Sequence, residues 1–398
     1  MSGRATPRNP RRILHLVSTP LYSGALPPTL GLALAQRTAG CQVWLAYDTK
    51  RGGFSDYEEP AAPLLEPHAL QPQTPLVLSS KSSPAEILRD VRRLRQLLFK
   101  NDIHVLHCHL SHDHVLGHWA ARASSTVVVR TLHSARSLQS RLGQRWLNRR
   151  AHGVLVRSEA HLEMLRRRFA VSPGRSECIP GGIDSAHFRP FTPEQRQAAR
   201  EHLGLPSEAL VVGNVGLMAG RGQEELLEAA RQSAMPQLHV LLVGRGGREQ
   251  ALRAQAEAAG LAKRVHFTGY LGREALPAAY AAMDAAFCAQ AGNDGSARAV
   301  LEAMACGLPV LGVAVEAIGE LVQQGGGVAL RSRAPADVAP ALQWLAHNPD
   351  AAHALGQAGR SLVLSERTHA HEAARTLNFY ARLRRVGGAE AAADTGNG

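Results

Sequence analysis

The chain has 398 residues, of which 45% are hydrophobic and 20% charged, a composition typical of a folded globular protein and not of a disordered one. This length suits two α/β domains better than one core. No apolar run approaches the ~20 residues that a membrane-spanning helix needs, and the five cysteines lack CxxC spacing. We therefore expect a cytoplasmic protein with reduced thiols.

The charge is distributed unevenly along the chain. Its formal net value is +12, and residues 1–190 contain 26 Lys and Arg against 13 Asp and Glu, whereas residues 191–398 contain 19 against 20. A uniformly basic protein would point to nucleic acid. One basic domain next to a neutral one indicates instead two domains with different partners.

Strand-like apolar runs alternate with helical stretches, which predicts parallel sheets with crossover helices. The predicted strands of the first half are 12–18, 42–48, 103–109, 126–133 and 153–158. After a Gly- and Pro-rich stretch at 179–196 the pattern restarts, with strands at 210–217, 239–245, 265–271, 285–290 and 309–315. The pattern predicts an α/β protein with two doubly wound, Rossmann-like domains that face one another across a cleft.

The predicted domain boundaries follow from the same pattern. The first domain is 1–190 and the second 191–366, followed by a helix at 367–386 and a disordered tail at 387–398. The position of this last helix does not say on which domain it packs.

Three strand–glycine–helix units in the second half indicate an anion site: GNVGLMAGRGQEE, LLVGRGGREQ and NDGSARAVLEAMACG. Glycine lets the backbone approach a ligand, and the helix N-terminus that follows presents free N–H groups. Each unit alone is typical of an ordinary turn. Three in one domain, with Arg221, Arg245 and Arg298 beside them, indicate a site for a diphosphate. The absence of GxxxxGK[ST] from the sequence disfavours a P-loop NTPase.

Several segments resemble the retaining GT-B glycosyltransferases of glycosyltransferase family 4. They are IPGGIDSAHFRP, VGNVGLMAGRGQEELLEA, VHFTGYLGREALPAAYAAMD and, most diagnostic, DGSARAVLEAMACGLPV, with a weaker match at PLYSGALPPTLGLALAQR. The resemblance implies a GT-B fold with an acceptor-side first domain and a second domain that binds a nucleotide sugar. It also implies transfer with retention of configuration, without a cofactor or a catalytic metal.

The resemblance also implies individual site residues. Glu302 matches the family glutamate that hydrogen-bonds the ribose hydroxyls, and Asp294 stands where a glutamate touches the sugar of the donor substrate. Leu217 stands where the family has a phosphate-binding arginine, which leaves open whether activity is weakened. The predicted residues for binding the nucleotide sugar are Gly24, Gly216, Arg221, Gly244, Arg245, Tyr270, Leu271, Gly295, Ser296, Arg298 and Glu302.

Histidines indicate the acceptor side and the reaction centre. His133, at a strand end, matches the family histidine that reaches the donor sugar, and we predict His133 and Asp294 as catalytic residues. Six histidines and Cys108 lie within 104–118, a set that could bind zinc. No HExxH arrangement is present in the sequence, so we predict no metal site and assign His109 and His112 to the acceptor side.

Two basic stretches, 89–100 and 135–150, read as amphipathic helices, the second with Leu138, Leu142 and Trp146 on its apolar face. Two interpretations of these basic residues remain. They form ordinary solvated helix faces, or they dock the protein to an anionic membrane surface, as a peripheral protein on the inner face of the membrane. We therefore expect a glycosyltransferase that moves a sugar from a UDP- or GDP-sugar to a glycan or lipid-linked acceptor, in cell-surface polysaccharide or lipopolysaccharide synthesis. The alternatives are a GT-B protein that binds or epimerises a nucleotide sugar without transferring it and, least favoured, a basic nucleic-acid-binding protein.

Overall fold

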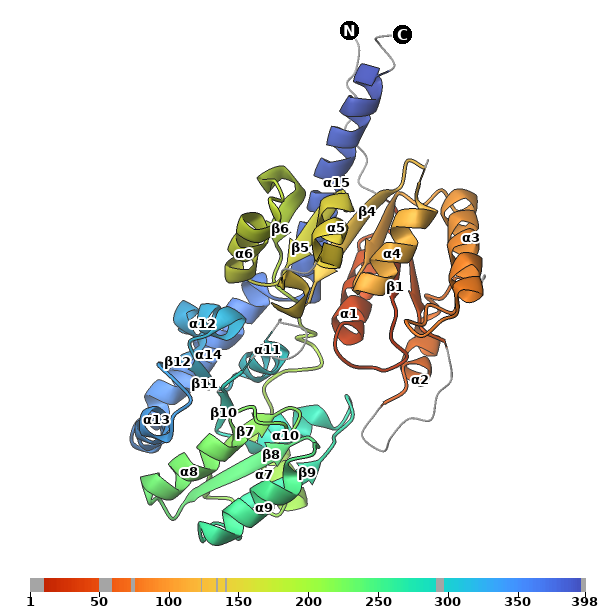
Figure 1. Ribbon diagram of the computed structural model, residues 1–398. Coiled ribbons are helices and arrows are strands. Elements are labelled where there is room, and N and C mark those ends of the chain that lie inside the picture. Colours follow the sequence, from red (N-terminus) through yellow and green to blue (C-terminus); the bar gives the residue numbers. More distant parts are fainter. Residues whose placement is uncertain are drawn as a thin grey trace. The chain divides into compact units, whose positions relative to one another are not determined.

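The structure is a computed structural model that describes residues 11–49, 59–72, 76–122, 124–133, 135–139, 142–290 and 297–394. The chain divides into two compact units, of which the first comprises Met1–Gly182 with His369–Gly398 and the second Ile183–Thr368. Figure 1 colours the chain by sequence, so the dark blue end of the chain, which belongs to the first unit, can be told from the red-to-yellow remainder of that unit.

The first unit is built on one parallel six-stranded sheet with the order β2-β1-β3-β4-β5-β6. Its strands are β1 (Arg12–Val17), β2 (Gln42–Tyr47), β3 (Val105–Cys108), β4 (Val127–Leu132), β5 (Gly153–Val156) and β6 (Ser176–Cys178). Its α-helices are α1 (Leu26–Thr38), α2 (Ala62–Leu65), α3 (Pro84–Lys100), α4 (Ser111–Ala120), α5 (Leu142–Arg150), α6 (Glu159–Phe169) and α15 (His369–Asp394).

The strands β3, β4 and β5 of this sheet are buried along their whole length because helices cover both faces. Every residue of β4, VVVRTL, is buried. On one face Val129 packs with Phe379 and Tyr380 of α15, and on the other Val128 packs with Leu94 of α3.

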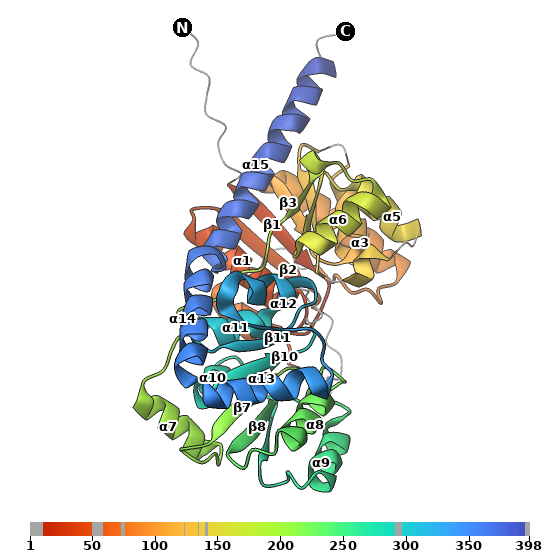
Figure 2. The same ribbon diagram turned by 90° about the vertical axis from the view of Figure 1, so that its left-hand side faces the viewer.

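The last helix, α15, packs against α1 within the first unit. A Cβ atom on Gly31 of α1 would lie 2.2 Å from the ring of His369, so this ring fills the space beside Gly31. Figure 2 shows α15 running past the sheet that carries β1 and β3. The C-terminal helix therefore completes the hydrophobic core of the first unit, which could not be predicted from its position in the sequence.

The second unit carries another parallel six-stranded sheet, with the order β12-β11-β10-β7-β8-β9. Its strands are β7 (Leu210–Val215), β8 (Leu238–Val243), β9 (Val265–Gly269), β10 (Ala285–Cys288), β11 (Val310–Val313) and β12 (Gly327–Leu330). Its α-helices are α7 (Pro193–His202), α8 (Gln223–Ser233), α9 (Glu249–Ala258), α10 (Leu276–Ala282), α11 (Arg298–Ala305), α12 (Glu316–Leu321), α13 (Pro335–His347) and α14 (Pro349–Glu366).

In each sheet the strand order reverses at one point, and in open α/β sheets ligands bind beyond the carboxyl ends of the strands at such a point. The reversal lies between β1 and β3 in the first sheet and between β7 and β10 in the second. The predicted α/β class with two Rossmann-like sheets is confirmed.

Candidate functional site

The loops after β7 and β8 lie together at the carboxyl edge of the second sheet. Met218 donates to the carbonyl of Arg245 at 2.9 Å, and Gly216 donates to the last residue of β8, also at 2.9 Å. Gly244 has φ +136°, and a Cβ atom there would lie 2.0 Å from the carbonyl oxygen of Gly216. Only glycine fits this contact, so the structure brings the predicted residues Gly216, Gly244 and Arg245 together.

The loop after β7 reaches the end of β10, across the reversal of strand order. Gly222, with φ +95°, precedes the first turn of α8, and a Cβ atom there would lie 2.5 Å from that of Ala289. Gln223 holds the loop: its side-chain oxygen accepts from the N–H of Arg221 at 2.8 Å, and its amide nitrogen donates to Asn214 at 3.1 Å. The hydrogen bond from Gln223 thus fixes the backbone of Arg221 next to the reversal of strand order. The side chain of Arg221 is half-buried there.

Leu217, in the same loop, is 48% exposed. An uncharged side chain therefore stands beside Gly216, at the position where the family resemblance implies a phosphate-binding arginine.

Glu302 lies on the inner face of α11 and is only 6% exposed. The hydroxyl of Tyr280 donates to its Oε2 at 2.7 Å, and Arg298 Nε lies 3.5 Å from its Oε1. Burial, and next the Glu302 carboxylate, raise the pKa of Tyr280 well above its ordinary value, so this side chain stays a phenol that donates. The carboxylate is therefore held in one orientation one helical turn after the start of α11.

The other predicted residues of this unit differ in exposure, and three of them lie outside the described residues. Tyr270 is 42% exposed directly after β9, Leu271 packs on the core, and the N–H of Gly244 donates to the last residue of β9 at 2.9 Å. The predicted residues Asp294, Gly295 and Ser296 lie outside the described residues.

Asp113 organises the reversal point of the first sheet. Its carboxylate accepts from the N–H of Ser18 after β1 at 2.7 Å, and from those of His109 at 3.1 Å and Leu110 at 2.7 Å after β3. Burial raises the pKa of this carboxyl to about 7, against the effect of these hydrogen bonds. Gly24, in the loop after β1, has φ +57°, and a Cβ atom there would meet nothing within 4 Å, so its glycine serves the turn.

The structure brings together two of the three histidines predicted for the reaction centre and the acceptor side. His109 Nδ1 lies 2.9 Å from His133 Nε2, and both side chains are buried at the ends of β3 and β4. His112 lies in the first turn of α4, and its Nε2 has no hydrogen-bond partner among the described residues.

A different set of histidines is compact enough to hold a metal ion. His15, His107 and His109 are buried, and one nitrogen of each lies within 4.8 Å of the others. All six of their ring nitrogens already have hydrogen-bond partners, among them Thr131 at 2.7 Å and Tyr380 at 2.6 Å from His107. A hydrogen-bonded core thus accounts for this three-histidine group, and the prediction of no metal site stays a prediction.

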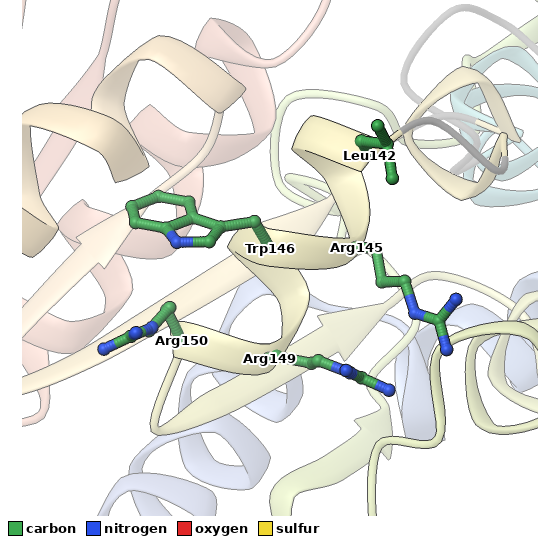
Figure 3. A pocket seen from close by; sticks show the side chains of 5 residues that line it. All are labelled: Leu142, Arg145, Trp146, Arg149 and Arg150. Carbon is green, nitrogen blue, oxygen red and sulfur yellow. The ribbon is translucent and has the colours of Figure 1, made fainter.

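A basic face with exposed aromatic rings lies on α4 and α5. Figure 3 shows a shallow pocket on α5, with Trp146 and Arg150 on one side of the helix and Arg145 and Arg149 on the other. Trp146 packs edge-on against His118 with ring centres 5.0 Å apart. We call the following residues the basic helical face: Trp119, Arg122, Leu142, Arg145, Trp146, Arg149 and Arg150.

The basic helical face corrects one detail of the sequence pattern. Leu138 is buried, but Leu142 is 88% and Trp146 37% exposed. Helix α5 begins at Leu142 and buries Leu147 and Asn148 instead. The prediction of one amphipathic helix over 135–150, with Leu142 and Trp146 on its apolar face, is therefore wrong. In the part of the chain that the structure describes, no helix is both long and apolar enough to span a membrane.

Solved structures share this architecture. The Anabaena protein Alr3699/HepE, crystallised with UDP and glucose, superposes with a TM-score of 0.76 at 20% identity, covering 92% of this chain and 98% of that one. The two parallel sheets and this likeness define the GT-B fold.

The family follows from the sequence. Residues 195–362 match the model of the glycosyl transferases group 1, and residues 29–187 match that of glycosyltransferase family 4. Together the two models span most of the chain, which therefore belongs to this family of glycosyltransferases.

Two curated relatives match at about 30% identity. The GDP-mannose-dependent monoacylated alpha-(1-6)-phosphatidylinositol monomannoside mannosyltransferase of Corynebacterium glutamicum is 32% identical, over 48% of this chain and 52% of the relative. The 2-deoxystreptamine N-acetyl-D-glucosaminyltransferase of Streptomyces fradiae is 31% identical, over 46% and 45%. The matched stretch thus spans about half the length of each.

Proposed function

We propose that the protein transfers a sugar from a UDP- or GDP-sugar to a glycan or lipid-linked acceptor, with retention of configuration, in the synthesis of cell-surface polysaccharide or lipopolysaccharide. The observation that carries this proposal is the buried carboxylate of Glu302, oriented by Tyr280 beside the reversal point of the second sheet. A fixed carboxylate suits the two neighbouring hydroxyls of a ribose, because it accepts both hydrogen bonds.

The diphosphate is assigned to the glycine loops next to Glu302. Gly216 leaves the backbone open to close approach, Gly244 allows the two loops to pack together, and Arg221, Arg245 and Arg298 supply positive charge. As the bond to the sugar breaks, negative charge develops on the leaving diphosphate, and cations already in position stabilise it. For this reason we expect no requirement for Mg²⁺.

Retention follows in this proposal from displacement on one face of the sugar. The leaving phosphate oxygen takes the proton of the acceptor hydroxyl, so the protein needs no separate general base. Its residues position the sugar and stabilise charge. We assign His133 and Asp294 to the donor sugar on the strength of the family motif.

We assign the acceptor to a membrane surface, to which the basic helical face of the first unit would dock. The basic helical face combines four arginines with exposed Trp119, Leu142 and Trp146. Each basic residue near an anionic bilayer contributes about 1 kcal/mol, and indole rings favour the lipid–water interface. A lipid-linked acceptor matches such a surface, and the Corynebacterium relative is named for a phosphatidylinositol mannoside.

Vesicle sedimentation tests this assignment. We expect binding to vesicles that contain phosphatidylglycerol, and the triple change of Arg145, Arg149 and Arg150 to Gln should weaken it about 100-fold. A matched control removes three exposed arginines of the second unit, Arg231, Arg253 and Arg331. Equal losses in both variants would mean that net charge alone acts, and would contradict a specific face.

The alternative is a nucleotide-sugar-binding protein without transferase activity, and the exposed Leu217 in the phosphate loop favours it. Calorimetry with UDP-glucose, GDP-mannose and ADP-glucose, followed by assay of nucleotide release, separates the two. We expect one of the UDP- or GDP-sugars to bind and to be turned over. Binding without turnover would establish the alternative, and no binding to any of the three would contradict the proposed donor substrate.

A further inference from the structure

A continuous chain of hydrogen bonds crosses the first unit from α1 to the end of β4. His15 Nε2 lies 2.8 Å from Gln36 Oε1, and His15 Nδ1 lies 3.0 Å from His109 Nε2. The bond from His109 to His133 continues it. All four side chains are buried, and none is more than 5% exposed. We call Gln36, His15, His109 and His133 the histidine chain.

The amide of Gln36 gives this chain a direction. In the orientation that the structure gives this amide, its oxygen faces His15 Nε2, which therefore carries the proton of their hydrogen bond, and a neutral imidazole has one N–H. His15 Nδ1 therefore accepts from His109 Nε2–H. By the same reasoning His109 Nδ1 accepts from Nε2–H of His133, whose Nδ1 is left with a lone pair.

The three histidine rings of the chain are neutral because they are buried. Burial lowers the pKa of His15 to about 4. The pKa values of His109 and His133 lie well below the ordinary value, first because of burial. Neighbouring histidine rings lower the pKa of His109 further, and the Arg157 guanidinium lowers both. At neutral pH each ring is therefore a single tautomer that donates on one side and accepts on the other.

The lone pair at the end of the chain has no partner. Among the described residues no group forms a hydrogen bond with His133 Nδ1, nor with Nε and Nη2 of the buried Arg157. Leu132 pairs with Val156, so His133 and Arg157 follow side by side at the carboxyl edge of β4 and β5. Arg157 Nη1 is occupied, at 2.6 Å from Glu372 and 3.2 Å from the carbonyl of Ile179.

An acceptor next to donors matches a hydroxyl group, which donates one hydrogen bond and accepts others. With the opposite direction of the chain, His133 would present an N–H beside the N–H groups of Arg157. Such an edge would favour a carbonyl or an anion. The direction set by Gln36 thus selects the chemistry of the ligand.

We propose that Gln36 and His15 are positioning residues that, through His109, hold His133 in the Nε2–H tautomer, so that its Nδ1 accepts from a hydroxyl of the sugar being transferred. This inference rests on the proposed function for the identity of the sugar. The direction of the histidine chain is independent of it and can be measured on the free protein.

The first experiment measures tautomers in the full chain labelled with ¹⁵N-histidine, by multiple-bond ¹H–¹⁵N correlation at pH 7.5. We expect His15, His109 and His133 to carry their proton on Nε2. A proton on Nδ1 of any of the three, or a charged ring, would overturn the proposal.

The second experiment adds UDP-glucose or GDP-mannose, whichever binds in calorimetry, and compares it with the free nucleotide diphosphate. The sugar nucleotide should shift the Nδ1 resonance of His133, and the diphosphate alone should leave it unchanged. A sugar nucleotide that binds without moving this resonance would mean that a buried water is the only partner, against the proposal. If neither probe binds, the proposed donor substrate fails, and the tautomers of the free protein decide on the histidine chain alone.

Two variants connect the chain to turnover. Gln36→Met removes the acceptor and should lower kcat/KM about tenfold with the affinity for the nucleotide diphosphate unchanged. Gln71→Met is the matched control, since Gln71 donates to Tyr47 at 3.1 Å in the same unit, outside the histidine chain. A rate unchanged by Gln36→Met, or lowered equally by the control, would contradict the positioning role.

Discussion

The substitution of Glu302 is the most informative change in the second unit. Glu302→Ala removes a carboxylate that is 6% exposed and hydrogen-bonded to Tyr280. We predict that it abolishes measurable nucleotide-sugar binding and leaves the fold intact. The isosteric change Glu302→Gln removes the charge and keeps one acceptor oxygen.

The magnitude follows from the hydrogen bonds that the carboxylate makes in the proposed complex. A hydrogen bond to a charged group contributes about 1.5–3 kcal/mol, so losing two to the ribose hydroxyls costs about 3 kcal/mol or more, which is roughly 150-fold in affinity. Glu302→Gln keeps one acceptor oxygen, for which the hydroxyl of Tyr280 competes. Because part of the binding to the ribose is kept, we expect a smaller loss there than in Glu302→Ala, about tenfold.

Titration calorimetry with UDP-glucose and GDP-mannose measures these affinities, and thermal unfolding checks the fold. Glu257→Ala, at an exposed glutamate of α9, is the matched control and should bind like the unaltered protein. Unchanged affinity in Glu302→Ala, with a normal melting temperature, would refute the assignment of Glu302 to the ribose.

Three further predictions concern charge. EDTA should leave turnover unaffected, since arginines and helix N-termini handle the phosphate charge; loss of turnover that added metal restores would point to the three-histidine group as a metal site. Arg221→Met should cost on the order of 3 kcal/mol of transition-state stabilisation, and the loss should appear in kcat if the charge acts on the leaving group. Leu217→Arg should leave activity unchanged or raise it. Kinetics of Arg221→Met equal to those of the unaltered protein would mean that another residue neutralises the phosphate. Burial opposes ionisation of Glu372, but Arg157 and His369 hold the pKa of its carboxyl at about 2, below the ordinary 4.5. Its contribution is therefore complete above about pH 4.5 and is lost as the pH falls through 2, which is about 3 kcal/mol of unfolding free energy. Urea unfolding of Glu372→Gln should show a correspondingly flatter pH dependence, and an unaltered slope would contradict the buried ion pair.

Much of the fold could be predicted because its strands are mostly apolar runs. Segments such as VVVRTL and LHVLLV are buried on both faces of a parallel sheet, and most of their residues are therefore apolar. Two strands escaped prediction, β6 with three residues and the glycine-containing β12, because at an edge of the sheet few apolar residues suffice. The exposed Leu142 shows the reverse error, since helical periodicity alone does not tell where a helix begins.

Candidate site residues could be predicted from the sequence only where a motif names them, and the sequence gives no signal where packing alone brings residues together. Glycines beside strand ends signal close backbone approach, and Gly216 and Gly244 meet as expected of such turns. Tyr280 and Gln223 carry no such signal, because a tyrosine within an Ala-rich helix and a glutamine at a helix start are ordinary residues. Their importance comes from partners that are distant in sequence, Glu302 and Asn214.

The same holds for Gln36 and His15. Each lies in a regular element far in sequence from His109, and only the parallel pairing of β1 with β3 brings His15 to it. A histidine in the middle of an apolar strand was nevertheless a usable signal, since a buried imidazole needs a hydrogen-bond partner.

The most direct test of the account is the release of nucleotide diphosphate from UDP-glucose and from GDP-mannose, measured for the unaltered chain and for Glu302→Ala in the same buffer with EDTA. The account predicts turnover of at least one of the two by the unaltered chain, and a rate lower by about 100-fold or more in the variant. Equal rates in the two proteins, or no release from either sugar nucleotide, would contradict it.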